Sequence, residues 1–104
     1  MSDTLIILVT AASADEAHTI ARTLVQEKLA ACVSRFPVQS TYTWEGNIED
    51  DEEWQLVIKT HRRQFQPLQE RVQELHSYDV PEIIALPIET GSAAYLNWIG
   101  ATVS

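Results

Sequence analysis

The stretch from Leu75 to Ile88, LHSYDVPEIIALPI, joins the end of a helical pattern to a run of apolar residues. Pro81 has no amide hydrogen and restricts the residue before it, so a helix must end upstream of it. Residues Ile83 to Ile88 are mostly branched and apolar at odd and even positions alike, as in a strand covered on both faces. The stretch therefore predicts a helix followed by a buried strand, with a His and a Tyr between them.

The helix upstream of this stretch has one apolar stripe. Its members recur at helical spacing: Phe65, Leu68, Val72 and Leu75. Pro67 lies inside the stripe and is tolerated only in the first helical turn. The regular helix is therefore expected to begin close to residues 64–66, or to kink there.

Two strands joined by a turn precede that helix. The first runs from Cys32 to Trp44 and is expected to break once, at Pro37; the second runs from Trp54 to Thr60. Alternation assigns one face of the first strand to Val38, Ser40, Tyr42 and Trp44, and one face of the second to Trp54, Leu56 and Ile58. Turn residues at 45–47 make this pair a long hairpin.

The two ends of the chain supply the remaining elements. Leu5 to Val9 is a short apolar run, typical of a central strand, and Ser13 to Glu16 forms a capping box in which Glu16 would reach back to Ser13. A helix is expected over residues 14–28, and a last short helix begins at Ser92. The apolar stripe of the first helix is Ala17, Ile20, Ala21, Leu24 and Val25.

This order predicts an α+β chain with the ferredoxin-like βαββαβ sandwich and an extra C-terminal helix, in a single domain over residues 1–104. The strand from Ile83 would lie at a sheet edge with apolar groups on both faces. Two helices can cover only one face of the sheet, so the other face and the edge remain open. The residues therefore predict association between copies of the chain.

Composition limits the partners and the compartment. The net charge is −8 at pH 7, which argues against nucleic acid and against an anionic membrane surface. The chain has one cysteine, so an internal disulfide is excluded and a reducing, cytoplasmic location is expected. The apolar run near the N-terminus is too short for a signal peptide or a membrane span.

Several motifs together resemble one family. LAACV, YTWEG, VIKT, HSYDVPEI and YLNWI, in this order, are similar to the CutA family of divalent-cation tolerance proteins. The resemblance implies an intertwined homotrimer like that of the PII signalling proteins. It also implies a non-enzymatic role in the response to metal ions, copper foremost, with no obligatory cofactor. The ligand would be Cu²⁺ or another divalent cation.

His76 is the candidate metal ligand, because imidazole suits Cu²⁺ and Zn²⁺. Some members of the family have Cys and His at the positions of Val9 and Leu75, so this chain lacks two of the proposed donors. Other subunits would have to complete a site. The structural alternative is that His76 caps the last carbonyls of its helix.

Five further residues match positions typical of the family: Lys59, Tyr42, Trp44, Tyr78 and Glu82. In a PII-like trimer they would meet in clefts between subunits, where a Lys and aromatic rings suit a small anionic or amphipathic ligand. A PII-like ligand sensor or adaptor is therefore the alternative function. The structural alternative is that these residues pack along the seam between subunits.

The remaining polar groups indicate less about the function. Cys32 is a possible soft-metal ligand but is expected to be a small buried apolar residue. Residues 45–53 hold six acids in a spacing unlike that of a calcium loop, which favours a solvated rim that attracts cations weakly. His18 and His61 are expected to face solvent. No motif for acyl transfer or phosphate binding occurs, and no nucleophile–base pair can be named.

Overall fold

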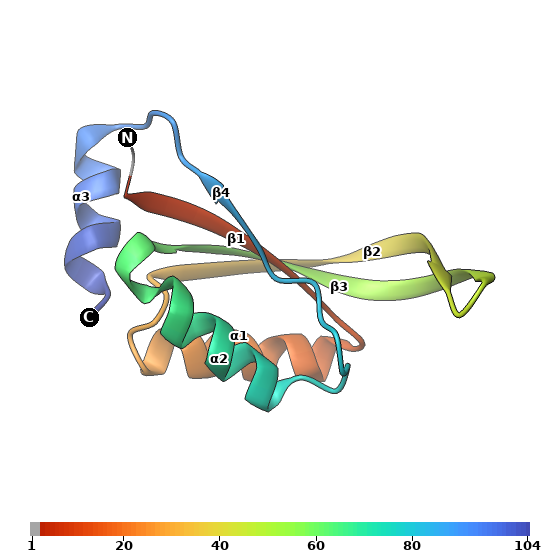
Figure 1. Cartoon of the computed structure of the whole chain (residues 1–104). Coiled ribbons are helices and arrows are strands. Elements are labelled where there is room, and N and C mark those ends of the chain that lie inside the picture. Colours follow the sequence, from red (N-terminus) through yellow and green to blue (C-terminus); the bar gives the residue numbers. More distant parts are fainter. Residues whose placement is uncertain (1–2) are drawn as a thin grey trace.

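The computed structural model of the chain describes residues 3–104 (Figure 1). The elements follow in the order β1 (Thr4–Ala11), α1 (Ala14–Gln26), β2 (Cys32–Trp44), β3 (Asn47–His61), a 3₁₀ turn η1 (Arg62–Gln64), α2 (Phe65–Leu75), β4 (Ile84–Pro87) and α3 (Ala93–Thr102). α2 begins two residues before Pro67, so the proline lies in its first turn and the predicted start is confirmed. Ser92 caps α3, also as predicted.

The four strands form one antiparallel sheet in the order β2-β3-β1-β4. β1 lies inside the sheet and β4 lies at an edge, and α1 and α2 lie together on one face (Figure 1). This arrangement confirms the ferredoxin-like fold with an extra C-terminal helix. β4 is shorter than expected, because only Ile84 to Pro87 pair with β1.

The core lies between the sheet and the first two helices. It contains alternate residues of β1 and β3 together with the apolar stripes of α1 and α2, and its largest members are Ile7, Ile20, Leu24, Leu56, Ile58 and Leu68. Val25, which was expected to belong to the α1 stripe, is 42% exposed and therefore lies beyond the edge of the stripe. A smaller cluster of Ala31, Ile99 and Val103 holds α3 at one end of the sheet.

The opposite face of the sheet is left open. The β1–β4 register pairs Ile6 with Leu86 and Leu8 with Ile84, so these side chains share the face away from α1 and α2. Ile84 and Leu86 are each about half exposed. The predicted apolar surface on the open face and on the edge strand is therefore present in the single chain.

The β2–β3 hairpin extends well beyond the end of β1, whose last residue, Ala11, pairs with Trp54 (Figure 1). The molecule measures 44 × 25 × 22 Å, and its radius of gyration of 14.2 Å exceeds the roughly 13 Å typical of a compact chain this long. Pairing runs from Cys32 to Trp44 without interruption, so the predicted break at Pro37 is wrong. β2 is an edge strand, which tolerates the missing amide hydrogen of a proline.

Two turns use backbone conformations that favour glycine. At the hairpin tip, Glu45 has φ 50° and Gly46 has φ 81°, as in the type I′ turns that match the twist of paired strands. After α1, Lys28 has φ 58° and its amide bonds to Val25 O, while the amide of Leu29 bonds to Leu24 O. This pattern is a Schellman C-cap with a lysine in the position that usually holds glycine.

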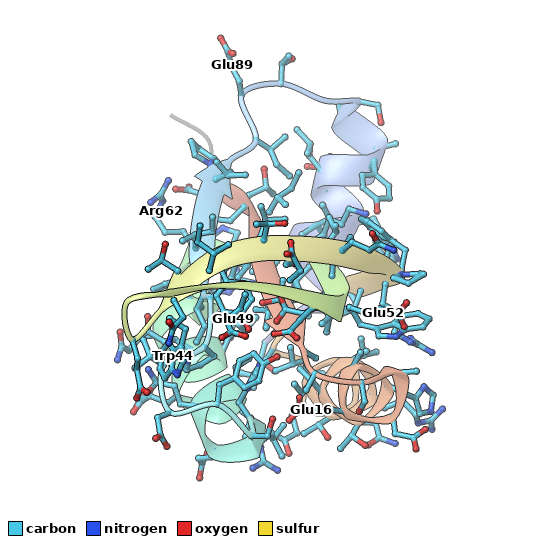
Figure 2. The ribbon with its side chains drawn as sticks, turned by 90° about the vertical axis from the view of Figure 1, so that its right-hand side faces the viewer. Glu16, Trp44, Glu49, Glu52, Arg62 and Glu89 are labelled. Atoms are coloured by element: carbon cyan, nitrogen blue, oxygen red, sulfur yellow. The ribbon has the colours of Figure 1, made fainter. Side chains whose placement is uncertain are left out.

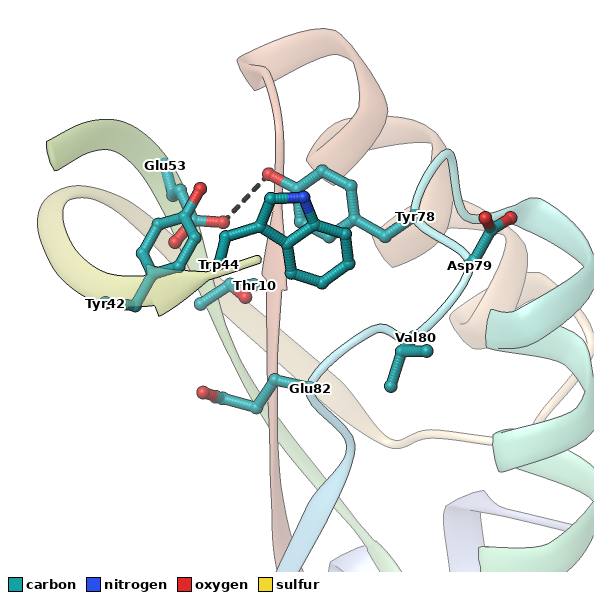
Figure 3. A pocket seen from close by; sticks show the side chains of 8 residues that line it. All are labelled: Thr10, Tyr42, Trp44, Glu53, Tyr78, Asp79, Val80 and Glu82. Carbon is teal, nitrogen blue, oxygen red and sulfur yellow. Dashed lines mark hydrogen bonds between the residues drawn. The ribbon is translucent and has the colours of Figure 1, made fainter. Parts of the chain in front are cut away.

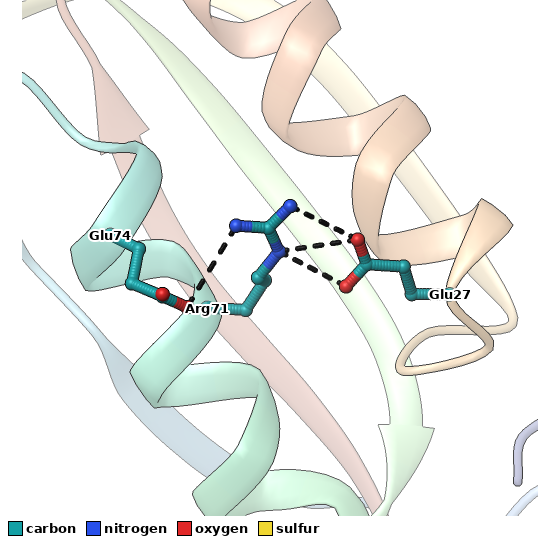
Figure 4. A network of polar contacts seen from close by, with 3 residues as sticks. All are labelled: Glu27, Arg71 and Glu74. Atoms are coloured by element: carbon teal, nitrogen blue, oxygen red, sulfur yellow. Dashed lines mark hydrogen bonds and ion pairs between the residues drawn. The ribbon is translucent and has the colours of Figure 1, made fainter.

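The C-terminal end of α1 is also tied to α2 by charge. Arg71 Nε lies 3.0 Å from Glu27 Oε1, and its Nη2 lies 3.0 Å from Oε2 (Figure 4). Glu74, one turn further along α2, adds a longer contact of 3.8 Å. The two-pronged Arg71–Glu27 pair thus links the end of α1 to α2 at the surface.

Candidate functional site

A cavity of about 440 Å³ lies between the β2–β3 hairpin and the loop that follows α2 (Figure 3). The residues that line it are Thr10, Tyr42, Trp44, Glu53, Tyr78, Asp79, Val80 and Glu82. Its volume falls within the range of small-molecule sites. Because it also brings together Tyr42, Trp44 and Tyr78, this cavity is the candidate functional site of the chain.

Strand register explains which hairpin residues reach the cavity. Leu56 and Ile58 face the helices, so Glu53, an odd number of residues away along β3, faces the other side of the sheet. Glu53 pairs with Val38, and alternation from Val38 brings Tyr42 and Trp44 to the same face. The predicted sharing of one face by these aromatic rings is confirmed.

Glu53 and Tyr78 form the polar centre of the cavity. Glu53 is only 6% exposed, although it is a carboxylate, and the Tyr78 hydroxyl donates a hydrogen bond of 2.8 Å to its Oε2 (Figure 3). Burial raises the pKa of Tyr78 well above the ordinary value of 10.0, and the hydrogen bond and the charge of Glu53 raise it further. Tyr78 therefore stays a neutral donor to this carboxylate.

Tyr42 lies on the hairpin side of the cavity and donates its hydroxyl hydrogen to Asp51 Oδ2. This hydrogen bond raises the pKa of Tyr42 to about 12, with smaller contributions from the nearby charges of Asp51, Glu53 and Glu49. Both phenols thus report an environment that disfavours additional negative charge.

His76 holds the end of the loop against β1. Its Nδ1 accepts the amide hydrogen of Tyr78 at 3.0 Å, and its Nε2 lies 2.6 Å from the carbonyl oxygen of Thr10. These contacts fit the tautomer with hydrogen on Nε2. His76 is the C-cap residue of α2, but its ring bonds to β1, so the predicted role of capping helix carbonyls is wrong. Metal ligation by His76 stays a prediction, and it would require the loss of one of these two bonds.

Glu16 supports the same loop from the other side. Its Oε1 accepts the Ala12 amide hydrogen at 2.9 Å, and its Oε2 accepts the Ser77 amide hydrogen at 2.8 Å. The capping box is therefore half confirmed: Ser13 accepts from the Glu16 amide, but Glu16 reaches back to Ala12 instead of Ser13. Desolvation raises the pKa of Glu16, but these bonds outweigh it and lower the pKa overall.

Four of the five residues predicted for the ligand cleft, Tyr42, Trp44, Tyr78 and Glu82, line the cavity. Lys59 does not. It lies six residues from Glu53 along β3, which corresponds to about 20 Å in an extended strand. The cavity of the single chain therefore lacks the positive charge on which the expectation of an anionic ligand depended.

The sequence interpretation missed Glu53, Thr10, Asp79 and Val80. The alternation of β3 contains the signal for Glu53, because a residue out of phase with Leu56 and Ile58 must face away from the core. Its burial has no such signal, since the side chain that covers it, Tyr78, comes from a loop 25 residues away. Asp79 and Val80 lie in that same irregular loop, where no period applies.

The other candidate ligands lie apart from one another. Within residues 3–104, no group of three or more His, Cys, Asp or Glu side chains is close enough to hold a metal ion. The labelled carboxylates of Glu16, Glu49, Glu52 and Glu89 are spread over the molecule (Figure 2). Asp50 and Asp51 accept hydrogen bonds from Thr41 and Tyr42 of the facing strand.

Three residues for which the sequence predicts no definite site lie in different surroundings. Cys32 is only partly buried, because it lies at the start of the edge strand β2. His18 is exposed as expected, and its Nδ1 lies 2.8 Å from Arg35 Nη2. His61 is partly buried instead of solvent-facing, and it caps η1 by accepting the Arg63 amide hydrogen.

No helix in the described part of the chain is long and apolar enough to cross a membrane. Residues 5–102 match the family model described as CutA1 divalent ion tolerance protein. The divalent-cation tolerance protein CutA of Thermus thermophilus is 47% identical over 95 residues, which cover 90% of this chain and 92% of the relative.

Solved structures agree with that match. The structure of the periplasmic divalent cation tolerance protein CutA from Archaeoglobus fulgidus superposes with a TM-score of 0.95 at 42% identity, over 97% of this chain and 99% of that one. The structure of the divalent cation tolerance protein from Thermus thermophilus gives the same TM-score of 0.95 at 44% identity, over the same shares of the two chains. Sequence and fold thus lead to one conclusion: the chain belongs to the CutA1 family of divalent ion tolerance proteins.

Proposed function

We propose that this protein contributes to divalent-cation tolerance as a non-enzymatic cation-binding protein, with Cu²⁺ foremost among its ions. The observation that carries the proposal is the family match over residues 5–102. The net charge of −8 supports it, because a negative surface concentrates cations nearby. The proposal includes no obligatory cofactor. It places the protein in the cytoplasm, because a single free cysteine fits a reducing compartment.

The working form in this proposal is a homotrimer. Its support is the apolar open face with Ile84 and Leu86, the unpaired edge of β4, and the hairpin that extends beyond β1. A single chain leaves all three unsatisfied, and pairing between copies would cover them. A trimer would also let several subunits supply donors to one ion.

His76 is the proposed copper ligand. It is half-buried beside the cavity, with its ring 4.8 Å from that of Tyr78. Because both ring nitrogens have backbone partners, copper would have to compete with the Thr10 or the Tyr78 bond, which favours a modest affinity.

Calorimetric titration with Cu²⁺ tests this assignment. The expected result is a saturable site with fixed stoichiometry per trimer, which is lost in His76→Ala and kept in His18→Ala. His18 is the matched control, because it is an exposed imidazole that does not line the cavity. Equal binding by both variants would remove His76 from the copper site, and unsaturable binding by the wild type would contradict specific copper binding altogether.

The second candidate function is a PII-like sensor or adaptor for a small ligand. The observation that favours it is the cavity of about 440 Å³ with two tyrosines and a tryptophan on its walls. A thermal-shift screen of metabolites would detect such a ligand, because binding to the folded state alone raises the melting temperature. The shift should be absent in a variant that fills the cavity, such as Val80→Trp.

A further inference from the structure

The charges around the cavity have one sign. Three of its eight lining residues are carboxylates, Glu53, Asp79 and Glu82, and none of the eight is basic. Glu53 comes from β3, and the other two come from the loop after α2, so negative charge borders the cavity from two parts of the chain (Figure 3). A ligand that enters this space meets a negative potential.

The buried carboxylate of Glu53 is only partly compensated. It can accept about four hydrogen bonds, and the one that the described residues supply comes from the Tyr78 hydroxyl. A neutral hydroxyl does not cancel the charge, and a cation beside the second carboxylate oxygen would be favourable, because charge-assisted hydrogen bonds are stronger than neutral ones. The free acceptor capacity of Glu53 is therefore the strongest attraction for a ligand in the cavity.

The aromatic walls strengthen the preference for positive charge. In the single chain, Trp44 is 54% exposed and Tyr42 is 38% exposed, both much more than a packed core ring would be. Trp faces attract cations best among the side chains, and their apolar surface also suits methyl or methylene groups. Val80, which is 79% exposed, extends this apolar surface on the loop side.

A bare metal ion does not fit the same space. Divalent ions need several oxygen atoms that converge to about 2.0–2.6 Å, and no group of three possible ligands within residues 3–104 is arranged in this way. The cavity is also large relative to a single ion. Its size and its aromatic walls suit a molecule with an apolar body.

We propose that the cavity binds a small organic cation, an ammonium or quaternary ammonium compound with a compact apolar body. The positive group lies against Glu53, and the body lies on the faces of Trp44 and Tyr42. The inference rests on the second candidate function, the small-ligand cleft, and it specifies the ligand class. It differs from the expectation of an anionic or amphipathic ligand in a cleft between subunits, which depended on Lys59.

One matched pair of probes tests the charge requirement. Choline and 3,3-dimethylbutan-1-ol have nearly the same shape, but only choline is charged; benzyltrimethylammonium and 1,4-diaminobutane extend the panel to aromatic and linear cations. Binding to the assembled protein would be measured by calorimetry and by NMR at low ionic strength. We expect at least one cation to saturate, and 3,3-dimethylbutan-1-ol to bind about tenfold more weakly than choline.

Two variants locate the site. Glu53→Gln keeps an acceptor for Tyr78 but removes the charge, and it should weaken cation binding about tenfold. Glu52→Gln is the control, because it removes the same charge from the next residue, which is exposed and does not line the cavity. Trp44→Leu should weaken binding about fivefold while Trp44→Phe retains most of it. Circular dichroism and light scattering would confirm that each variant keeps its fold and assembly.

Each remaining outcome contradicts the inference in a distinct way. Equal losses of cation affinity in Glu53→Gln and Glu52→Gln would mean that general surface charge, and not Glu53 in the cavity, attracts the cation. Stabilisation by neutral or anionic compounds alone would support the small-ligand function but contradict a cationic ligand. No binding by any probe or screened metabolite would reject both. A structure of the assembly with a partner's basic side chain on Glu53 would reject the cation but not the ligand cleft.

Discussion

At the scale of single residues, Glu16 contributes more to the site than its place in a capping pattern predicts. One carboxylate accepts the amide of Ala12, before α1, and the amide of Ser77, after α2. His76 makes the matching connection between the same loop and Thr10. Two side chains thus determine where Tyr78 lies relative to Glu53.

Replacing Glu16 should therefore weaken the protein in a pH-dependent way. The hydrogen bonds lower the pKa of Glu16 in the folded state, so its contribution is complete above the unfolded pKa, about 4.3, and is lost as the pH falls through the folded pKa. We expect Glu16→Gln to lower the free energy of unfolding by about 1 kcal/mol at pH 7.

Urea denaturation at fixed protein concentration measures this effect at pH 7 and again at pH values below the folded pKa of Glu16, where wild type and variant should converge. Asp15→Asn is the control, because Asp15 lies in the same first turn of α1. An equal loss in Asp15→Asn would mean that the helix dipole, and not the loop contacts, explains the effect.

A second residue-scale prediction concerns the phenol of Tyr42. Its hydrogen bond to Asp51 is the main reason that its pKa reaches about 12, so Asp51→Asn should return the pKa toward 10.0. The contribution of Tyr42 to the free energy of unfolding is therefore lost as the pH rises from about 10 to about 12. In that range the unfolded chain loses a phenol proton that the folded chain keeps.

Ultraviolet titration of phenolate, with Tyr42→Phe as the difference reference, would measure the change. Asp50→Asn removes a neighbouring charge that bonds to Thr41 instead, and it should shift the titration much less. If Asp51→Asn left the titration of Tyr42 unchanged, the hydrogen bond would not be the cause.

At the scale of elements, the C-cap of α1 has a residue that does not suit its conformation. Lys28 has φ 58°, a left-handed value that costs a side-chain-bearing residue about 1 kcal/mol. Lys28→Gly should therefore raise the free energy of unfolding by about 0.5–1 kcal/mol, with the Schellman bonds intact. Thermal or urea unfolding would show it, and Lys28→Ala, which removes the charge but keeps the strain, should show no gain.

The elements were largely predictable from the sequence because their signals are local. Each of these signals depends on residues a few positions apart: the Ser13 cap, the apolar stripe of α2 that contains Pro67, and the alternation that includes Tyr42 and Trp44. The prediction at Pro37 was wrong because the effect of a proline depends on whether its strand lies at a sheet edge. Whether a strand lies at an edge depends on the order of the strands in the whole sheet.

The site was less predictable for the same reason. Tyr42, Trp44, Tyr78 and Glu82 were identified by the resemblance to a family, and they meet within one chain. Lys59 lies about 20 Å along β3 from Glu53, so its place in a cleft between subunits stays a prediction. Glu53 was missed because its burial depends on Tyr78. Contacts between distant segments decide these matters, and no short pattern reports them.

At the scale of the whole molecule, the open face of the sheet should control assembly. Leu86 is 47% exposed on this face, and Leu86→Lys would place a charge where the proposed trimer needs apolar contact. We expect this variant to run as a single chain of 11.7 kDa in light scattering, while the wild type runs as a trimer. Val25→Lys, at 42% exposure on α1, is the control and should remain assembled.

The hairpin beyond β1 has a consequence for how the protein could respond to a ligand. Tyr42 and Trp44 belong to a two-stranded arm, whereas Tyr78 and Glu82 belong to a loop fixed to the main sheet, so the cavity changes shape whenever the arm twists. A neighbouring subunit bound to the tip of the arm would then change the affinity of the cavity for its ligand. An occupied cavity would change the affinity of that subunit contact by the same factor. In the proposed trimer, if each hairpin tip contacts a neighbour, ligand binding to one subunit would alter the affinity of the next.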